Sequence, residues 1–479
     1  MGPMSSGPLE SAYGTFVRRD QHEISITPVE TVTVIPQHFI TYKRRWLYLF
    51  VICLANLSNA ILWINFASIA DFTAQYYSVS YTSVNWLSLI FMVVCTIFTL
   101  LSTWKIDRFG IRFGILTGIW LNLVGSFIRC ISTWGFVGMK AKYPVVFIGQ
   151  FVCAYAQTFI LFIPTKFAFI WFPDSQRTLA NSLCFAMNYF GIFLGTVLPP
   201  FIVDHANKMP LLLYVSLAPA LLAAVLSLTI RSGEPPTPSC LSSTDVKVPY
   251  KLLLKSKSYL ILFGTVGLGL SNNNTLSTLL QQIMCPFGYD DISVGLCIGS
   301  FILCGLTGCI IFGYIADRTK KLEEVTKIEY TLGVVSLMIL GLFIINGVPS
   351  YLLYIIFGLS GFAMAPVLPL SLDLCLECTH PIPEATVVGI FLIASQIGSI
   401  ISILILPFFT RSLSSFQEAH QKCASLHQEI RDYTIPLYIL AIISAVFVIL
   451  FIIFFKSENR RQRKDDESSS HTTALNNNE

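Results

Sequence analysis

Side chains able to form several hydrogen bonds stand inside long apolar stretches of this chain of 479 residues. Burying such a side chain in a membrane is costly, so each is a candidate for binding a solute. Asparagine and glutamine amides both donate and accept hydrogen bonds, which suits a neutral or hydroxylated organic solute. The alternative for an isolated amide is a hydrogen bond that joins two packed helices. The residues in question are Asn56, Asn59, Trp63, Asn65, Gln150, Gln157, Asn188, Asn272, Asn273, Asn274, Gln281, Gln282 and Gln396.

Carboxyl groups are scarce in the same stretches. The nearest are Asp71, at the outer end of the first stretch, and Asp373 and Glu377, at the inner end of the tenth. Asp373 and Glu377 are four residues apart and share one helix face. The alternatives for them are a gating pair, a group that attracts cations, or a solvated helix end. A proton-driven carrier usually needs a titratable group inside the membrane. We therefore expect facilitated diffusion.

Motifs for enzyme chemistry are absent from the sequence, which has no phosphate-binding Gly-x-x-x-x-Gly-Lys-Ser/Thr loop, no His-Glu-x-x-His and no Gly-x-Ser-x-Gly. We expect neither an enzyme nor an ATP-driven pump, and neither a metal nor a cofactor. Haem usually takes a ligand such as histidine, and all 7 histidines, from His22 to His471, fall in tails, loops or helix ends. The residues do not favour haem as a substrate.

The elements that would position these residues are membrane-spanning helices. Hydrophobic residues make up 54% of the chain and charged residues 12%, and the mean hydropathy is +0.67, outside the soluble range. An apolar stretch of about 20 residues crosses a bilayer as a helix. We expect an all-α polytopic membrane protein with twelve transmembrane helices in two six-helix halves. The spans are expected near 46–68, 84–104, 111–131, 144–165, 178–202, 211–230, 258–281, 292–315, 328–347, 350–374, 386–409 and 433–455.

Charge and composition divide the chain further. Residues 1–45 form an N-terminal tail without the features of a signal peptide, and residues 456–479 form a polar tail expected to be disordered. A linker at 231–257, rich in Pro and Ser, joins the halves at 46–230 and 258–455. Basic residues gather beside the tails and inner loops, so both termini are expected in the cytoplasm. They form no single patch, so we expect no nucleic-acid partner.

A short motif recurs at the equivalent point of each half. Lys105-Ile106-Asp107-Arg108 continues to Arg112 after the second span, and Ala316-Asp317-Arg318 follows the eighth. Both turns resemble the loop signature of the major facilitator superfamily, with one glycine missing from each copy. The resemblance implies that these turns pair with charges at neighbouring helix ends and part as the halves rock. Charges that only set the topology are the alternative. The gating residues are then Asp107, Arg108, Arg112, Arg177, Asp317, Arg318 and Glu384, with Arg177 and Glu384 as the expected partners.

Longer strings narrow the resemblance. Residues 59–67 (NAILWINFA), 85–88 (NWLS) and 171–173 (WFP) resemble the feline leukaemia virus subgroup C receptor-related group of solute carrier family 49. Members of that group are reported as transporters of choline, ethanolamine or haem, and one as a lysosomal vitamin transporter. The resemblance implies a membrane transporter of a small organic solute, a choline-like or ethanolamine-like amine or a related metabolite, working by alternating access.

The same resemblance points to binding residues. Trp63, Gln157 and Gln396 match positions where choline-carrying relatives hold the substrate, with the aromatic face meeting a quaternary ammonium. Asn274 stands where those relatives have a tyrosine, so half of the aromatic cage is absent. The expected substrate-binding set is Trp63, Gln157, Asn274, Gln396, Asn59 and Asn188. Haem transport, and a receptor or scaffold that no longer transports, are the alternatives.

Most cysteines lie in apolar spans as packing residues. Cys285 and Cys423 fall in outer-side loops, where a disulfide between them is possible. We expect a monomer that contacts the lipid bilayer and its solute, in the plasma membrane or alternatively in an organelle membrane.

Overall fold

The computed structural model describes residues 42–233, 235, 253, 256–319, 321–379, 384–423 and 430–456. The predicted tails at 1–45 and 456–479 and the linker at 231–257 lie wholly or largely outside these residues. Within them the regular structure is helical, apart from one isolated bridge between Arg411 and Asp432. Eleven helical segments of this described part are long and apolar enough to cross a membrane.

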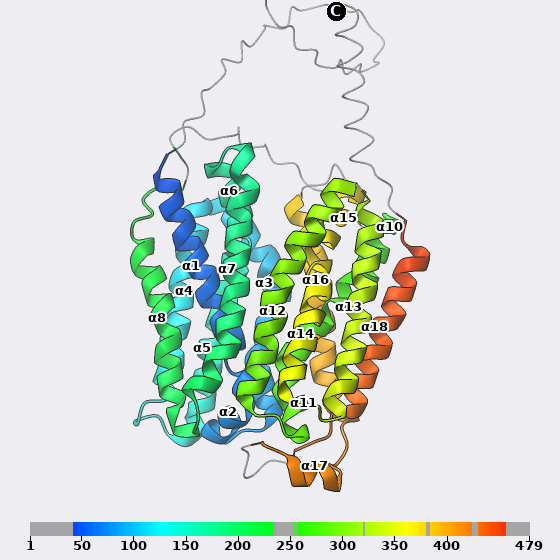
Figure 1. The fold of residues 1–479 in the computed structure, drawn as a ribbon. Helices are drawn as coiled ribbons and strands as arrows, with labels where there is room; N and C mark the ends of the chain where they lie inside the picture. Colours follow the sequence, from blue (N-terminus) through cyan, green and yellow to red (C-terminus); the bar gives the residue numbers. More distant parts are fainter. Residues whose placement is uncertain are drawn as a thin grey trace, which may run out of the picture. The chain divides into compact units, whose positions relative to one another are not determined.

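The N-terminal half contributes six of these segments (Figure 1). Its helices are α1 (Arg44–Ile64), α3 (Tyr81–Phe109), α4 (Ile111–Ile131), α5 (Met139–Ile160), α6 (Ile163–Trp171), α7 (Asp174–Ile202) and α8 (Met209–Ser227). The first segment continues from α1 through the short η1 (Ala67–Ile69) and α2 (Ala70–Tyr77), and α6 prolongs α5 after a break of two residues.

The C-terminal half contains α12 (Asp291–Thr319), α13 (Leu322–Ile345), α14 (Ser350–Met364), α15 (Val367–Thr379), α16 (Glu384–Ile405) and α18 (Thr434–Phe454). Its first segment is broken into α10 (Lys257–Leu262), a π-helical stretch (Phe263–Gly267) and α11 (Ser271–Met284). Glycines at 264, 267 and 269 explain the break, because glycine is a weak helix former. Counting this segment, the twelve expected spans are all present.

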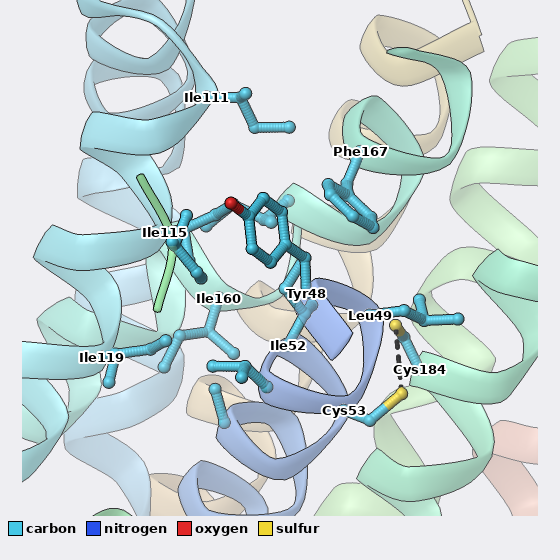
Figure 2. Close-up of a cluster of buried hydrophobic side chains, with 14 of the residues drawn as sticks. Tyr48, Leu49, Ile52, Cys53, Ile111, Ile115, Ile119, Ile160, Phe167 and Cys184 are labelled. Carbon is cyan, nitrogen blue, oxygen red and sulfur yellow. Dashed lines mark hydrogen bonds between the residues drawn. The ribbon is translucent and has the colours of Figure 1, made fainter. Parts of the chain in front are cut away.

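Each half has its own apolar interior. Figure 2 shows one such cluster, in which Tyr48 and Ile52 of α1 pack near Ile115 of α4, Ile160 of α5 and Phe167 of α6. Large apolar side chains also cover the outward faces of many helices, and α18 is the extreme case, with only 22% of its most apolar window buried. Such faces suit contact with lipid, because the bilayer is the solvent for them.

The two ends of the helix bundle carry different short helices. Figure 1 shows α2 and α17 (Ser415–His420) at one end and α6 and α15 at the other. Following the predicted orientation, we call the end with α2 and α17 the outer side and the opposite end the cytoplasmic side.

Candidate functional site

A cavity of about 250 Å³ lies between the two halves. α1, α3, α5 and α7 of the N-terminal half line it, together with α11, α12, α14 and α16 of the C-terminal half. Five of the six predicted binding residues line this cavity: Trp63, Gln157, Asn188, Asn274 and Gln396. Residues more than 300 positions apart in the sequence therefore converge on one space.

Charged side chains are absent from the described lining of this cavity. Its polar groups are amides, the hydroxyls of Thr99, Ser277 and Ser395, and the phenol of Tyr189. Apolar side chains such as Phe91 and Ile298 complete the wall. A small polar solute would be held here by hydrogen bonds and aromatic faces, without an ion pair.

Trp63 lies in the last turn of α1, where both halves meet. Its ring packs beside Leu89 and Met92 of α3 and Ile403 of α16. Its indole Nε1 is buried and has no hydrogen-bond partner within the described structure. A buried donor without a partner is destabilising.

The three consecutive asparagines at the start of α11 have different surroundings. Asn272 is buried and donates to Ser444 of α18. Asn274 lines the cavity and donates to Ser399 Oγ of α16 at 3.2 Å. Asn273 also lines the cavity, and its buried Oδ1 has no partner among the described residues. Two residues of the cavity lining thus have a buried polar atom without a partner in the described structure, Nε1 of Trp63 and Oδ1 of Asn273.

Asn59, the sixth residue of the predicted binding set, has different surroundings. It is 1% exposed and does not line the cavity. Its Nδ2 donates to Asn122 Oδ1 of α4 at 2.9 Å and to the Cys153 carbonyl of α5 at 3.0 Å. Asn59 therefore joins three packed helices, which was the alternative for an isolated amide.

Two buried charged residues escaped the sequence analysis. Arg129 of α4 is 1% exposed, donates to Asn65 Oδ1 at 2.9 Å and lies over the ring of Phe66. Glu329 of α13 is fully buried, and neither carboxyl oxygen has a hydrogen-bond partner in the described structure. Both residues fall within predicted spans, so a charge inside an apolar span was the available signal.

The first cytoplasmic turn makes its contacts inside the N-terminal half. Asp107 forms an ion pair with Lys166 of α6, a partner that the sequence analysis missed. Arg108 lies over the ring of Trp104, and Arg112 donates to the Ile230 carbonyl at 3.1 Å. Arg177, the predicted partner, donates its Nε to the Phe172 carbonyl at 3.2 Å and lies over Phe169.

In the second cytoplasmic turn, the structure gives side-chain contacts for Arg318. Arg318 donates to the hydroxyl of Tyr314, one turn earlier in α12, at 2.7 Å. The side chains of Asp317 and Glu384 lie outside the described residues, so their predicted pairing stays a prediction. The contacts of Asp107, Arg112 and Arg318 given above all stay within one half.

The outer side closes differently, by direct packing of α7 against α12. A Cβ atom added to Gly295 would lie 2.7 Å from the Thr196 carbonyl oxygen, and one added to Gly299 would lie 2.8 Å from Val197 Cγ2. Only glycine permits this approach, because a side chain would overlap the facing helix.

A polar contact crosses the same outer interface. Gln282 of α11 donates to Asn85 Oδ1 of α3 at 2.6 Å, and its Oε1 accepts from Tyr433 at 3.1 Å. The hydrogen bond between Gln282 and Asn85 joins the two halves on the outer side.

A disulfide joins Cys285 and Cys423, the two cysteines expected in outer loops. It ties the end of α11 to the segment that follows α17, where Lys422 N–H also donates to the Cys285 carbonyl at 3.2 Å. This pair lies beside the outer closure, since Cys285 and Tyr433 line the same outer depression.

Comparisons with known proteins agree with this architecture. The family described as Major Facilitator Superfamily matches residues 49–403. The chain is 36% identical over 426 residues to solute carrier family 49 member A3 of Danio rerio, covering 86% of this chain and 88% of that protein. It is 28% identical over 377 residues to the choline/ethanolamine transporter FLVCR2 of Homo sapiens, covering 75% and 70%.

A solved structure shares the fold. The crystal structure of a D-xylose-proton symporter superposes with a TM-score of 0.65 at 16% identity, covering 86% of this chain and 98% of that one.

Proposed function

The chain belongs to the major facilitator superfamily, within solute carrier family 49, and from this premise we propose that it carries a small hydroxylated amine of the ethanolamine or choline class. Alternating access around the central cavity would move the solute down its gradient. The observation that carries the proposal is the convergence of Trp63, Gln157, Asn274 and Gln396 from both halves on one uncharged cavity. The human relative named as a choline/ethanolamine transporter supports the substrate class.

The chemistry of the cavity suits such a solute. The amides of Gln157, Asn274 and Gln396 in the cavity lining can pair with a hydroxyl group, because an amide both donates and accepts hydrogen bonds. The ring faces of Trp63 and Tyr189 can attract an ammonium group by cation–π interaction. The absence of a carboxylate from the described lining favours weak, reversible binding, which facilitated transport requires.

The arrangement of the halves supports the transport cycle. Close packing at Gly295 and Gly299 seals the outer side, while the cytoplasmic turns contact their own halves. We infer that the structure is an inward-facing state. In the opposite state the Asp107 and Arg318 turns would pair across the halves. We place the protein in the plasma membrane with both termini in the cytoplasm.

Haem fits less well as the transported solute. A cavity of about 250 Å³ is smaller than the roughly 300–1,000 Å³ that holds a drug-sized ligand, and no histidine lines its described wall. A receptor or scaffold without transport would have no need for amides from both halves to line a central cavity.

Uptake and thermal stability test the proposal together. Choline or ethanolamine should raise the melting temperature of the purified protein. Proteoliposomes that contain the protein should show saturable uptake of the same solute. Trp63→Ala should weaken both effects at least tenfold, because it removes an aromatic face. Trp120→Ala is the matched control, since Trp120 is 42% exposed on α4 and lies outside the cavity. Equal behaviour of the two variants would overturn the binding site, and neither stabilisation nor uptake with any amine would overturn the substrate class.

A further inference from the structure

The end of α1 lies next to Trp63, the aromatic residue of the cavity wall. The helix ends at Ile64, and the chain turns there before it continues into η1. The last four carbonyl groups of a helix lack partners within it, so the Leu62 carbonyl needs donors from elsewhere. It accepts from Arg129 Nη1 of α4 at 3.2 Å and from Gln150 Nε2 of α5 at 3.0 Å. Side chains from two neighbouring helices therefore complete the end of α1.

Arg129 forms hydrogen bonds on both sides of Trp63 in the sequence. Its Nη2 donates to Asn65 Oδ1 at 2.9 Å, while its Nη1 donates to the Leu62 carbonyl. The guanidinium group is planar and rigid, so its two terminal nitrogens hold these acceptors at a fixed separation. The group also lies over the ring of Phe66, 4.6 Å from the ring centre. The backbone of Trp63 is thus held between two fixed points.

Gln150 and Asn65 connect these points to the rest of the N-terminal half. Gln150 is fully buried, and its Nε2 also donates to the Leu87 carbonyl of α3 at 3.0 Å. The Nδ2 of Asn65 donates to Ser216 Oγ of α8 at 3.1 Å. The residues that flank Trp63 are therefore bonded to four other helices, α3, α4, α5 and α8.

Two glycines let Arg129 reach α1 from α4. A Cβ atom added to Gly125 of α4 would lie 2.8 Å from the Gly149 carbonyl oxygen of α5. One added to Gly149 would lie 2.8 Å from both the Gly125 carbonyl oxygen and Arg129 Cγ. Small residues allow such close approach between membrane helices. The arginine stem lies over Gly149, and the whole side chain is buried between the helices.

Stability alone does not explain an arginine at this position. Its charge always remains, and a charge away from water is destabilising unless it is well hydrogen-bonded. Both of its acceptors are neutral oxygens, and its buried Nε has no partner in the described structure. Arg129 does not line the cavity itself. What its two hydrogen bonds do is set the backbone geometry around Trp63.

We propose that Arg129 is a positioning residue for substrate recognition. Together with Gln150 it fixes the end of α1, so that the indole of Trp63 is held in the cavity wall before any solute binds. This inference rests on the proposed function, because it assigns part of the affinity for an amine to a preorganised aromatic face. A preorganised group binds more tightly than a mobile one, since less conformational freedom is lost on binding.

Arg129→Lys separates recognition from transport rate. Lysine keeps the charge but has a single nitrogen, so it cannot hold the Leu62 carbonyl and Asn65 as a rigid fork does. The concentration of choline or ethanolamine that gives half-maximal uptake should rise about 2-fold to 12-fold, the range for ordering one side chain on binding. The maximal rate should stay nearly the same, because the contacts between the two halves are unchanged.

Fluorine NMR of the full chain in lipid nanodiscs tests the positioning without any solute. The protein is labelled with 5-fluorotryptophan at its 7 tryptophans, and the signal lost in Trp63→Phe identifies Trp63. The parent protein should give one narrow Trp63 signal. Arg129→Lys should broaden or divide that signal, because residues 62 and 65 are no longer held together. Gln150→Leu should act in the same way, since it removes the second donor to the Leu62 carbonyl.

Asn65→Ala gives an independent test should Arg129→Lys not fold, because it removes the Oδ1 acceptor and leaves the arginine in place. Asn122→Leu is the matched control. Asn122 lies on the same helix and joins α4 to α1 through Ser58 and Asn59, at 2.9 Å each, and none of these bonds involves residues 62–65. It should lower the melting temperature, yet leave the Trp63 signal and the half-saturating concentration unchanged.

An unchanged Trp63 signal in Arg129→Lys, Gln150→Leu and Asn65→Ala, or an equal change in Asn122→Leu, would overturn the positioning role. A changed signal with an unchanged half-saturating concentration would overturn the link to recognition. Because the NMR measurement contains no solute, a parent protein that binds neither choline nor ethanolamine would count against the proposed function alone.

Discussion

The outer and cytoplasmic ends of this bundle differ in how the two halves meet. On the outer side, α7 and α12 approach until Gly295 leaves no room for a Cβ atom, and Gln282 bonds to Asn85 across the interface. On the cytoplasmic side, Asp107 and Arg318 bond to Lys166 and Tyr314 of their own halves. The outer contacts named here join the two halves, whereas these two cytoplasmic contacts do not.

This difference explains how similar halves can give two accessible sides. Close helix packing and buried hydrogen bonds act over short range and are lost together when the surfaces separate. The Asp107–Lys166 pair at the cytoplasmic turn is partly exposed, and we expect such charges to exchange for partners in the other half in the opposite state. We expect substitutions in the outer contact to shift the state and those at the cytoplasmic turns to do little here.

Of the substitutions considered, Gly295→Leu should change the balance between the inward-facing and outward-facing states most. The new side chain would overlap the Thr196 carbonyl, whose oxygen lies 2.7 Å from an added Cβ. Overpacking costs about 1–3 kcal/mol, which shifts the ratio of inward-facing to outward-facing protein by roughly 5-fold to 150-fold. Spin labels at Thr82→Cys and Ser412→Cys, both exposed on the outer side and in different halves, would measure this shift. The distance between the two labels should lengthen.

Gly313→Leu on the same helix is the control for Gly295→Leu, since an added Cβ there meets nothing within 4 Å. Lengthening in both variants, or in neither, would show that the α7–α12 approach does not hold the outer side closed.

Gln282→Leu should have an intermediate effect. It removes the hydrogen bonds to Asn85 and Tyr433 and leaves a buried amide without its partner. Polar contacts between membrane helices contribute about 0.6 kcal/mol on average, up to about 1.7, so we expect a shift of about 3-fold to 20-fold toward the outward-facing state. Label distances and the melting temperature would measure it, and an unchanged distance distribution would mean that the contact does not stabilise the closure.

Lys166→Ala should have the smallest effect. The ion pair with Asp107 joins side chains that are 34% and 71% exposed, and exposed pairs contribute about 0–1 kcal/mol. The melting temperature should change little, and the outer label distance should not change. A large shift in that distance would contradict the view that the cytoplasmic turns are uncoupled from the outer contact in this state.

Much of the fold follows from the sequence because a bilayer imposes a simple rule. Each apolar stretch must be a helix, so the expected span at 111–131 coincides with α4. The seventh span at 258–281 is also present, but its glycines divide it into α10, a π-helical stretch and α11. Five of the six residues expected to bind substrate line the central cavity and Asn59 does not, while their role in binding stays a prediction.

The sequence by itself determined the number of spans, the family and which side chains are costly to bury. Only the tertiary structure decided what each of those side chains contacts. Asn272, Asn273 and Asn274 have the same chemistry in the sequence, yet one bonds to α18, one has a buried acceptor without a partner in the described structure and one bonds to α16. Hydropathy reports that a residue lies in a helix, whereas the neighbour that it meets depends on how helices distant in the chain pack together.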